Sequence, residues 1–192
     1  MKSTTAIRSK ILETATHLFY TQGYNSTGIN QIIDESNIAK ASLYHHFKSK
    51  SDLLYAYLEE FSDRWFVQLH SHIDPLNDPK EKILGLFDFR MNRQVVSNYG
   101  GCPFIKASAE VAPEDQRAFE LINQNKMKFR DLILELLQPA AFKKGALTKE
   151  ELADTLYLLI EGATVTAGFQ KTKAAMTNAK AIAEKLVEGA MA

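Results

Sequence analysis

The sequence predicts an all-α protein of about nine helices. Apolar residues recur every three or four positions along nearly the whole chain, which is the period of an amphipathic helix. No segment shows the alternation of apolar and polar residues, bounded by turn residues, that is typical of a β-hairpin. Residues that favour helix starts and helix ends divide the pattern into segments. We therefore expect a group of three short N-terminal helices followed by a larger helical part.

The first fifty residues predict three short helices. The first ends near Gly23, because glycine adopts the positive φ that terminates a helix. Ser26 or Thr27 can cap the second, since a hydroxyl accepts a hydrogen bond from a free N–H of the first turn. Asn37 predicts a tight turn because asparagine tolerates the left-handed region, and the third helix then runs to Phe47. The apolar positions of the first two helices are Ile7, Ile11, Ala15, Leu18, Ile29, Ile32 and Ile33.

Two longer helices follow. Ser49 and Asp52 are three residues apart and form a capping box at the start of the fourth helix. That helix ends before Asp74–Pro75, because the residue that precedes a proline is disfavoured in α geometry. Asp78–Pro79 begins the fifth helix with a cap and a first-turn proline. The apolar stripes of the two helices are Leu54, Leu58, Phe61, Trp65 and Leu69, and Ile83, Phe87 and Met91.

The remaining sequence predicts four further helices. Prolines mark two of the starts, because proline fits the first turn of a helix, and glycine or proline marks the ends. Thr148 and Glu151 form a second capping box. The expected bounds are Pro103 to about Val111, Pro113 to Pro139, Thr148 to just before Gly168, and an alanine-rich final helix that contains Ile182, Leu186 and Val187.

Composition narrows the classes of protein that fit. The chain has 192 residues, of which 45% are hydrophobic and 24% charged, a balance typical of a globular protein. The single cysteine, Cys102, excludes an intramolecular disulfide, and the polar N-terminus does not resemble a secretion signal, so we expect a cytoplasmic location. No run approaches the roughly 18 apolar residues of a membrane-spanning helix, so we expect no membrane partner.

The net charge of zero conceals an asymmetry. Residues 1–50 contain six lysines and arginines against three acidic residues, a net charge of +3, and the remainder carries −3. A basic N-terminal part indicates an anionic partner such as nucleic acid, although a solvated surface also explains three charges.

Three short helices with a tight turn between the second and third are typical of a helix-turn-helix DNA-binding module. The segment closely resembles the TetR family of bacterial transcriptional regulators, and the resemblance weakens beyond the fourth helix. It rests on Arg8, Ile11–Leu12, Ala15, Leu18–Phe19, Gly23–Tyr24, Thr27, Ile29, Ile32, Ile38–Lys50 (IAKASLYHHFKSK) and Leu53–Leu54. It implies a helix-turn-helix DNA-binding domain at residues 1–50 and a helical effector-binding and dimerisation domain at residues 51–192.

The side chains of the third helix have the chemistry that duplex DNA requires. Small or hydroxyl residues at its start let the backbone approach the major groove, while Lys40 extends towards base edges or phosphate. Tyr44 and His45 can donate hydrogen bonds to phosphate oxygens, and Lys50 lies at a helix N-terminus, which also favours a phosphate. The resemblance implies that Thr27, Tyr44, His45 and Lys50 hold the DNA backbone, with Ala39, Lys40, Ala41 and Ser42 near the bases.

The segment also departs from the family pattern. Many members have serine where Ala39 stands, and glycine in place of Asn37 and of Ala41. Replacing a serine cap by alanine costs about 1 kcal/mol, so we expect the third helix to be less firmly held before DNA binds.

The resemblance further implies that the larger part binds a small, largely apolar effector and forms a homodimer. By position, the residues expected around the effector are Trp65, Phe87, Met91, Cys102, Phe104, Phe129 and Tyr157, although such residues are also ordinary core residues. Small residues on the last two helices would let two copies approach closely, namely Gly162, Ala163, Thr166, Ala179, Ala183 and Leu186. The alternative is that these small residues complete the core of one chain.

These observations predict a DNA-binding transcriptional regulator, in the simplest form a homodimeric repressor that an effector releases from a palindromic double-stranded operator. We expect no enzymatic activity, no cofactor and no metal, because the sequence has no phosphate-binding glycine loop or zinc-protease motif, and the adjacent His45 and His46 point about 100° apart on a helix. The alternative is a helical small-molecule-binding or enzymatic bundle whose N-terminal module is only structural. Activation in place of repression stays open, as does a sensing role for Cys102.

Overall fold

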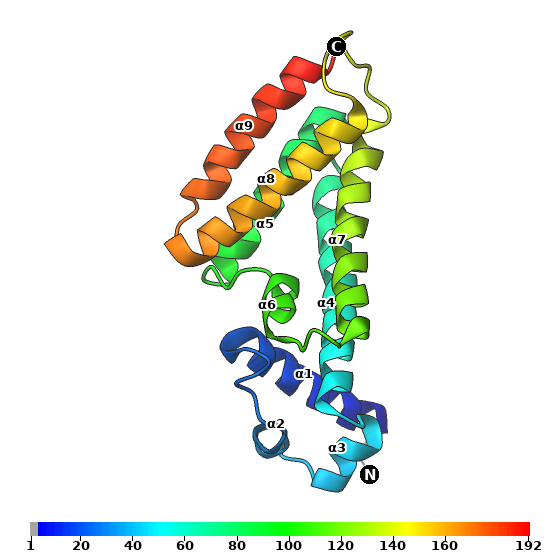
Figure 1. Ribbon diagram of the computed structural model, residues 1–192, viewed down its shortest axis with the longest axis vertical. Coiled ribbons are helices and arrows are strands. Elements are labelled where there is room, and N and C mark those ends of the chain that lie inside the picture. Colours follow the sequence, from blue (N-terminus) through cyan, green and yellow to red (C-terminus); the bar gives the residue numbers. More distant parts are fainter. Residues whose placement is uncertain (1–3) are drawn as a thin grey trace. The chain divides into compact units, whose positions relative to one another are not determined.

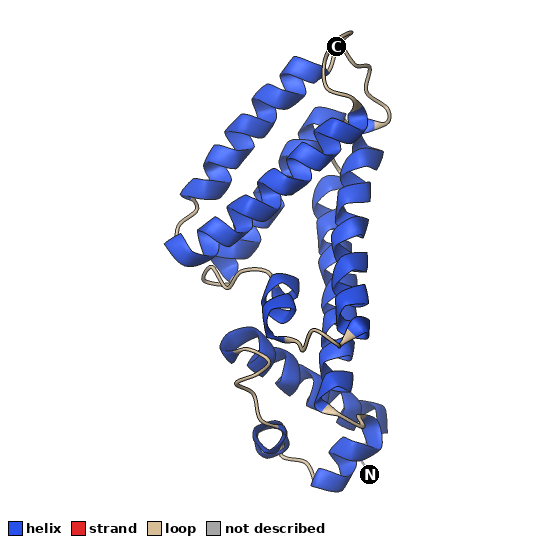
Figure 2. Cartoon of the chain, viewed as in Figure 1, coloured by secondary structure: helices blue, strands red, loops and turns tan. Residues whose placement is uncertain are grey.

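The computed structural model describes residues 4–192, and its regular secondary structure is helical throughout that range, apart from one isolated bridge between Phe142 and Met191 (Figures 1 and 2). The described helices are α1 (Thr4–Gln22), α2 (Ile29–Ser36), α3 (Lys40–His46), α4 (Lys50–Ile73), α5 (Pro79–Val96), α6 (Pro103–Glu110), α7 (Gln116–Leu137), α8 (Lys149–Gln170) and α9 (Ala174–Ala190). This confirms the predicted all-α fold. Lys2, one of the six basic residues of the N-terminal part, lies outside the described residues. In the part of the chain that is described, no helix is both long and apolar enough to span a bilayer.

The described residues form two compact units. Unit 1 consists of the described residues up to Arg64 together with Pro103–Asn123, and unit 2 of Trp65–Cys102 and Gln124–Ala192. The helices α4 and α7 therefore contribute to both units. Unit 1 extends past residue 50, because the first part of α4 and all of α6 pack with the N-terminal helices. The domain boundary between residues 50 and 51 itself stays a prediction.

The N-terminal helices of unit 1 have the ends that local sequence predicts. Helix α1 ends at Gln22, and Gly23 follows with φ +97°. Asn37 adopts the left-handed conformation, with φ 47° and ψ 56°, between α2 and α3. The Ser49–Asp52 capping box is present, since the Asp52 N–H donates to Ser49 Oγ at 3.0 Å and the Ser49 N–H donates to Asp52 Oδ2 at 3.1 Å. Each of these signals is local, which explains why they are confirmed.

Unit 2 contains a group of three mutually packed helices, α5, α8 and α9, in which α8 and α9 run side by side (Figure 1). Asp78 caps α5 by accepting a hydrogen bond from the Lys80 N–H at 3.0 Å, and the capping box of Thr148 and Glu151 starts α8. Both caps confirm the sequence prediction. The buried face of α8 consists of Leu152, Ala153, Leu156, Ile160, Ala163, Thr164 and Ala167.

Three predicted helix ends were wrong. The N-cap of α2 is Gly28, without a side-chain hydrogen bond, rather than Ser26 or Thr27. Helix α7 begins at Gln116 instead of Pro113, because the Asp115 carboxylate accepts from the Ala118 N–H at 3.1 Å and so caps the helix there. Helix α8 continues through Gly168 to Gln170, since a helix tolerates one glycine where its other residues are well packed.

Candidate nucleic-acid interface and effector site

Helix α3 is anchored in unit 1 by two apolar side chains. Leu43 and Phe47 are buried, and the Arg8 guanidinium lies 5.0 Å from the centroid of the Phe47 ring. The turn before α3 is closed by the Ile38 N–H, which donates to Ile33 O at 3.3 Å. These contacts leave the opposite face of α3 open.

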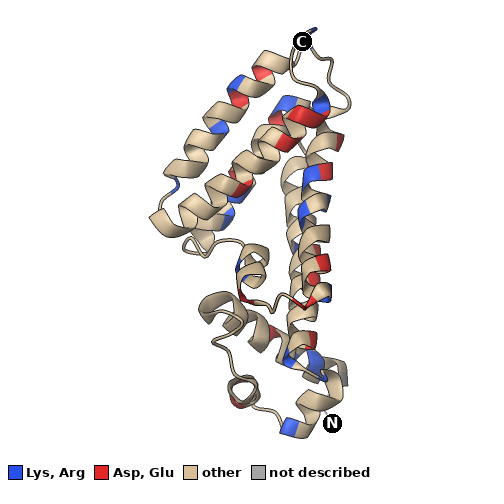
Figure 3. Cartoon of the chain, viewed as in Figure 1, with Lys and Arg blue, Asp and Glu red and all other residues tan. Residues whose placement is uncertain are grey.

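The open face of α3 carries the predicted base-reading residues. Ala39, Lys40 and Ala41 are exposed, and Ser42 is half-buried. Small side chains at this point leave the backbone accessible to a macromolecular partner. Helix α3 begins with Lys40 and carries no acidic residue (Figure 3).

The predicted phosphate ligands at the end of α3 are also accessible. Tyr44 is 39% exposed and His45 is exposed. Lys48, which the sequence prediction left out of the site, is exposed as well, and its ammonium donates to Tyr44 O at 3.2 Å. Partial burial lowers the pKa of His46, and the charges of His45 and Arg8 lower it further. The positive charges near this end of α3 are thus those of Lys48 and Arg8, which would attract a phosphate.

Lys50 is the first residue of α4, as predicted, and is held in place by an aromatic ring. Its ammonium lies 4.3 Å from the centroid of the Tyr24 ring. Burial lowers the pKa of Lys50, an effect that the charge of Glu110 opposes. Glu110 itself accepts from the Asn25 N–H at 2.7 Å, which ties α6 to the turn after α1. Lys50 therefore places a positive charge at the positive end of the α4 helix dipole.

The geometry does not support the predicted phosphate contact of Thr27. Its side chain is only 1% exposed. The hydroxyl donates to Gly23 O at 2.7 Å and accepts from the Gln22 side-chain amide at 3.2 Å. Thr27 thus stabilises the turn between α1 and α2 and does not present its hydroxyl to solvent.

The missing serine cap of α3 leads to a stability prediction. Ala39 is the N-cap, with φ −73° and ψ 142°, and makes no side-chain hydrogen bond. We expect Ala39→Ser to raise the free energy of unfolding by about 1 kcal/mol, because a hydroxyl there accepts from a free N–H of the first turn. Urea unfolding followed by circular dichroism measures this. Ala41→Ser is the matched control, because the same hydroxyl inside the helix gives no cap, and equal stabilisation by both variants would contradict the prediction.

Of the residues predicted around the effector, unit 2 brings four into one buried cluster. Trp65 and Phe129 have ring centroids 5.3 Å apart, and Phe129 and Tyr157 6.4 Å apart. Cys102 joins them through Lys126, whose ammonium is 3.3 Å from its sulfur. Burial raises the pKa of Tyr157, and the nearby charges of Glu161 and Cys102 add to the effect against that of Arg90.

The other three predicted effector residues lie elsewhere in their units. Phe87 is fully buried core, and the half-buried Met91 accepts a hydrogen bond from the Thr177 hydroxyl at 3.7 Å. Phe104 belongs to unit 1, where its ring packs against Phe61 at 6.2 Å. Whether any of them contacts an effector stays a prediction.

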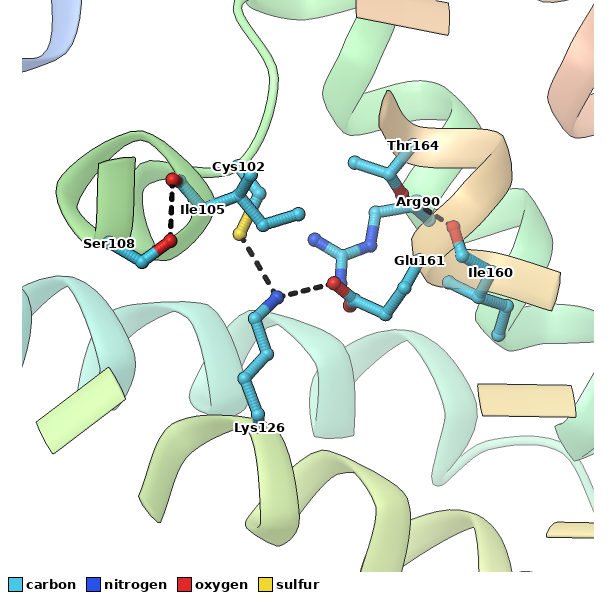
Figure 4. Close-up of polar contacts among 8 residues, drawn as sticks. All are labelled: Arg90, Cys102, Ile105, Ser108, Lys126, Ile160, Glu161 and Thr164. Atoms are coloured by element: carbon cyan, nitrogen blue, oxygen red, sulfur yellow. Dashed lines mark hydrogen bonds and ion pairs between the residues drawn. The ribbon is translucent and has the colours of Figure 1, made fainter. Parts of the chain in front are cut away.

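The sequence prediction missed the charged residues of the same cluster. Arg90 donates to Glu161 at 3.1 Å, and Lys126 donates to the other oxygen of that carboxylate at 2.5 Å (Figure 4). A signal was available in the sequence, because Arg90 follows Ile83 and Phe87 at core-facing spacing on α5. A charged residue on an apolar stripe indicates a buried partner or a ligand.

Unit 2 also has an open groove of about 480 Å³ between α4 and α7. It is lined by Phe66, His70, Gln124, Met127, Lys128, Asp131, Leu132 and Glu135. None of the predicted effector residues lines it. Within residues 4–192, no group of three or more histidine, cysteine or acidic side chains is placed to hold a metal ion.

The predicted dimer residues divide into two sets. Ala163, Ala179 and Ala183 are buried within the single chain, where small side chains let the helices of unit 2 pack closely. For these three, burial supports the alternative interpretation, that small residues complete the core. Gly162 is exposed, and Thr166 and Leu186 are half-buried. The exposed apolar residues of these two helices are Leu158, Val165 and Phe169 on α8 and Ile182 on α9.

Comparison with known proteins identifies the N-terminal part. The family model described as bacterial regulatory proteins, tetR family, matches residues 11–57, which include α2, α3 and the start of α4. The HTH-type transcriptional repressor KstR2 of Mycolicibacterium smegmatis is 36% identical over 80 residues, which are 42% of this chain and 39% of that protein. Residues 11–57 therefore match the DNA-regulator family tetR. The matched segment spans about two fifths of the length of this relative.

Weaker similarity extends along most of the chain. A probable acrEF/envCD operon repressor of Escherichia coli is 28% identical over 167 residues, which are 81% of this chain and 71% of that protein. The crystal structure of a TetR transcriptional regulator from Chloroflexus aurantiacus matches with a TM-score of 0.85 at 20% identity and covers 100% of both chains. The latter similarity shows that the two chains share a fold.

Proposed function

We propose that this chain is a homodimeric transcriptional repressor of the TetR family that acts in the bacterial cytoplasm and leaves a palindromic DNA operator when a small effector binds in unit 2. The observation that carries the proposal is the open face of α3. Its exposed residues are small or basic apart from Tyr44, while Leu43 and Phe47 hold the helix from behind. A helix presented in this way fits the major groove of DNA.

The proposed DNA contacts follow from exposure and charge. Ala39, Lys40, Ala41 and Ser42 would approach base edges, and Tyr44, His45 and Lys50 would hold phosphates. Lys48 joins the second group because it is exposed at the end of α3. Thr27 is left out because its hydroxyl is buried and already bonded.

Dimerisation is proposed through the outer faces of α8 and α9. Leu158, Val165 and Phe169 are separated by seven and four residues and thus form one stripe along α8, and Gly162 within it leaves open space above the backbone. An exposed apolar stripe of this kind is typical of a protein interface. Two copies would place two α3 helices in successive major grooves, about 34–36 Å apart.

Release from DNA would require the effector to prefer the unbound conformation. A hundredfold loss of operator affinity corresponds to a preference of about 2.7 kcal/mol. Helix α4 is suited to transmit the change, because Lys50 lies at its start and Trp65 belongs to the cluster in unit 2.

The direct test is selection of duplex DNA from a random pool, followed by a mobility-shift assay on the enriched sequence. We expect an inverted repeat with half-sites one helical turn apart, or a multiple of this. Indifference to all duplexes at low salt would refute the proposal.

Two substitutions separate backbone contacts from base contacts. We expect Lys50→Ala to weaken binding to every sequence and to reduce the slope of log affinity against log salt concentration by about 1, because one phosphate contact is lost. Ser42→Ala should instead change the preferred sequence and leave the slope unaltered. Affinity measured at several salt concentrations, on selected and scrambled duplexes, distinguishes the two. Identical effects of the variants on both quantities would contradict the assignment.

A further inference from the structure

Three helices of unit 2 bring two cations and one carboxylate into a buried cluster. Arg90 comes from α5, Lys126 from α7 and Glu161 from α8, and their side chains are 8%, 12% and 14% exposed (Figure 4). Both cations bind the same carboxylate, so the cluster has a formal net charge of +1. An uncompensated charge in a buried place is unfavourable unless another group neutralises it.

Two polar atoms beside this cluster have no partner in the described chain. Arg90 Nε and Gln94 Oε1 are buried and make no hydrogen bond with any described residue. The two residues are four apart on α5 and therefore lie on one face of that helix. Glu161 engages only the Nη2 atom of Arg90, and the neighbouring Nε–H has no acceptor among the described residues. Buried polar atoms are nearly always bonded, so this pair calls for an explanation.

The surroundings of the Arg90 guanidinium are aromatic. The Arg90 guanidinium lies 4.9 Å from the centroid of the Trp65 ring and 5.4 Å from that of the Phe129 ring. Phe89 packs against Trp65 at 5.4 Å, and Tyr157 against Phe129 at 6.4 Å. A ligand that reached Arg90 would therefore place its apolar part against rings.

We propose that Arg90, with Gln94 and Lys126, forms a subsite for the carboxylate of a small, largely apolar acid. The inference rests on the proposed function, because it names the chemical class of the effector. The ligand carboxylate would accept from Arg90 Nε–H and from the Gln94 amide, once that amide has turned about its last torsion. A guanidinium binds a planar carboxylate well, and a single negative charge balances the net +1 of the cluster.

The test uses Trp65 as a reporter, because it is the only tryptophan in the sequence and lies next to Arg90. The intact protein is titrated with 4-phenylbutyrate, 4-phenylbutanol and 4-phenylbutylamine, which differ only in the terminal group, and tryptophan fluorescence is recorded. We expect the carboxylate to bind about tenfold more tightly than the alcohol, and the amine to bind most weakly. Equal affinity for the three probes would overturn the proposal.

Two variants of the cluster sharpen the test. Glu161→Gln should tighten binding of 4-phenylbutyrate about tenfold, because it removes a like charge beside the ligand carboxylate. Arg90→Lys should weaken it about tenfold, because it keeps the charge and removes the Nε donor. Glu150→Gln is the matched control, since Glu150 is an exposed carboxylate on the same helix. A purely structural cluster predicts weaker or unchanged binding for Glu161→Gln, and that result would refute the subsite.

The thermal unfolding midpoint provides a second readout if Glu161→Gln destabilises the chain. We expect 4-phenylbutyrate to raise this midpoint more in Glu161→Gln than in the wild type, because the probe neutralises the two cations that the substitution leaves. No such difference would count against the subsite. Operator binding is measured separately on the same preparations. Specific DNA binding without carboxylate preference refutes the subsite alone, whereas carboxylate preference without DNA binding refutes only the proposed function.

Discussion

Replacing both Leu158 and Phe169 by glutamate is expected to convert the proposed dimer into a monomer and to lower operator affinity by at least about 100-fold. The two side chains are 66% and 69% exposed on α8, so the change does not disturb the core of the single chain. Two carboxylates facing their counterparts across a two-fold axis would repel, and the apolar contact would be lost. A single half-site contact is too small for tight, selective binding.

Light scattering and a mobility-shift assay measure the two effects of this double variant. Val67→Glu is the matched control, because Val67 is also 66% exposed but lies on α4. The control should keep both the dimer mass and the operator affinity. A double variant that stays dimeric would show that the stripe on α8 is not the interface.

The substitution Ala41→Glu is expected to reduce affinity for any duplex by at least about 100-fold. Ala41 lies on the open face of α3, so its replacement would bring a carboxylate towards bases and phosphates. The same carboxylate near the start of a helix favours helix formation, so stability should not fall. Lower DNA affinity at unchanged stability would therefore show that the variant has lost a DNA contact and has kept its fold.

Circular dichroism and DNA binding are measured together for this variant. Ala109→Glu is its control, because Ala109 is an exposed alanine of unit 1 on α6. We expect the control to bind the operator as the wild type does. Retained binding by Ala41→Glu would mean that the face of α3 does not approach DNA.

The parts of the fold that the sequence predicted well are those that depend on neighbouring residues. Gly23 ends α1 and Asn37 turns the chain before α3, because each conformation is a property of one residue type. The capping boxes at Ser49 and Thr148 need only a partner three residues away. The start of α7 was missed because proline and aspartate both favour a helix start, and only the structure shows that Asp115 caps it.

The candidate sites were predictable to different extents. The α3 residues form one local segment, so their type and spacing are enough to indicate the interface. The dimer residues stay a prediction for Gly162, Thr166 and Leu186, because small residues suit both a core and an interface. Burial of Ala163, Ala179 and Ala183 within the chain places them in the core.

The sequence by itself determined the helices, the turn before α3 and the chemistry of the residues that α3 presents, because periodicity and capping act over a few residues. Only the tertiary structure decided which apolar face of α8 stays exposed and that Glu161 binds both Arg90 and Lys126. Glu161 is 71 residues from Arg90 and 35 from Lys126, and no local pattern links positions so far apart. Their meeting depends on how α5, α7 and α8 pack, and packing is set by the fit of whole helix faces rather than by any short segment.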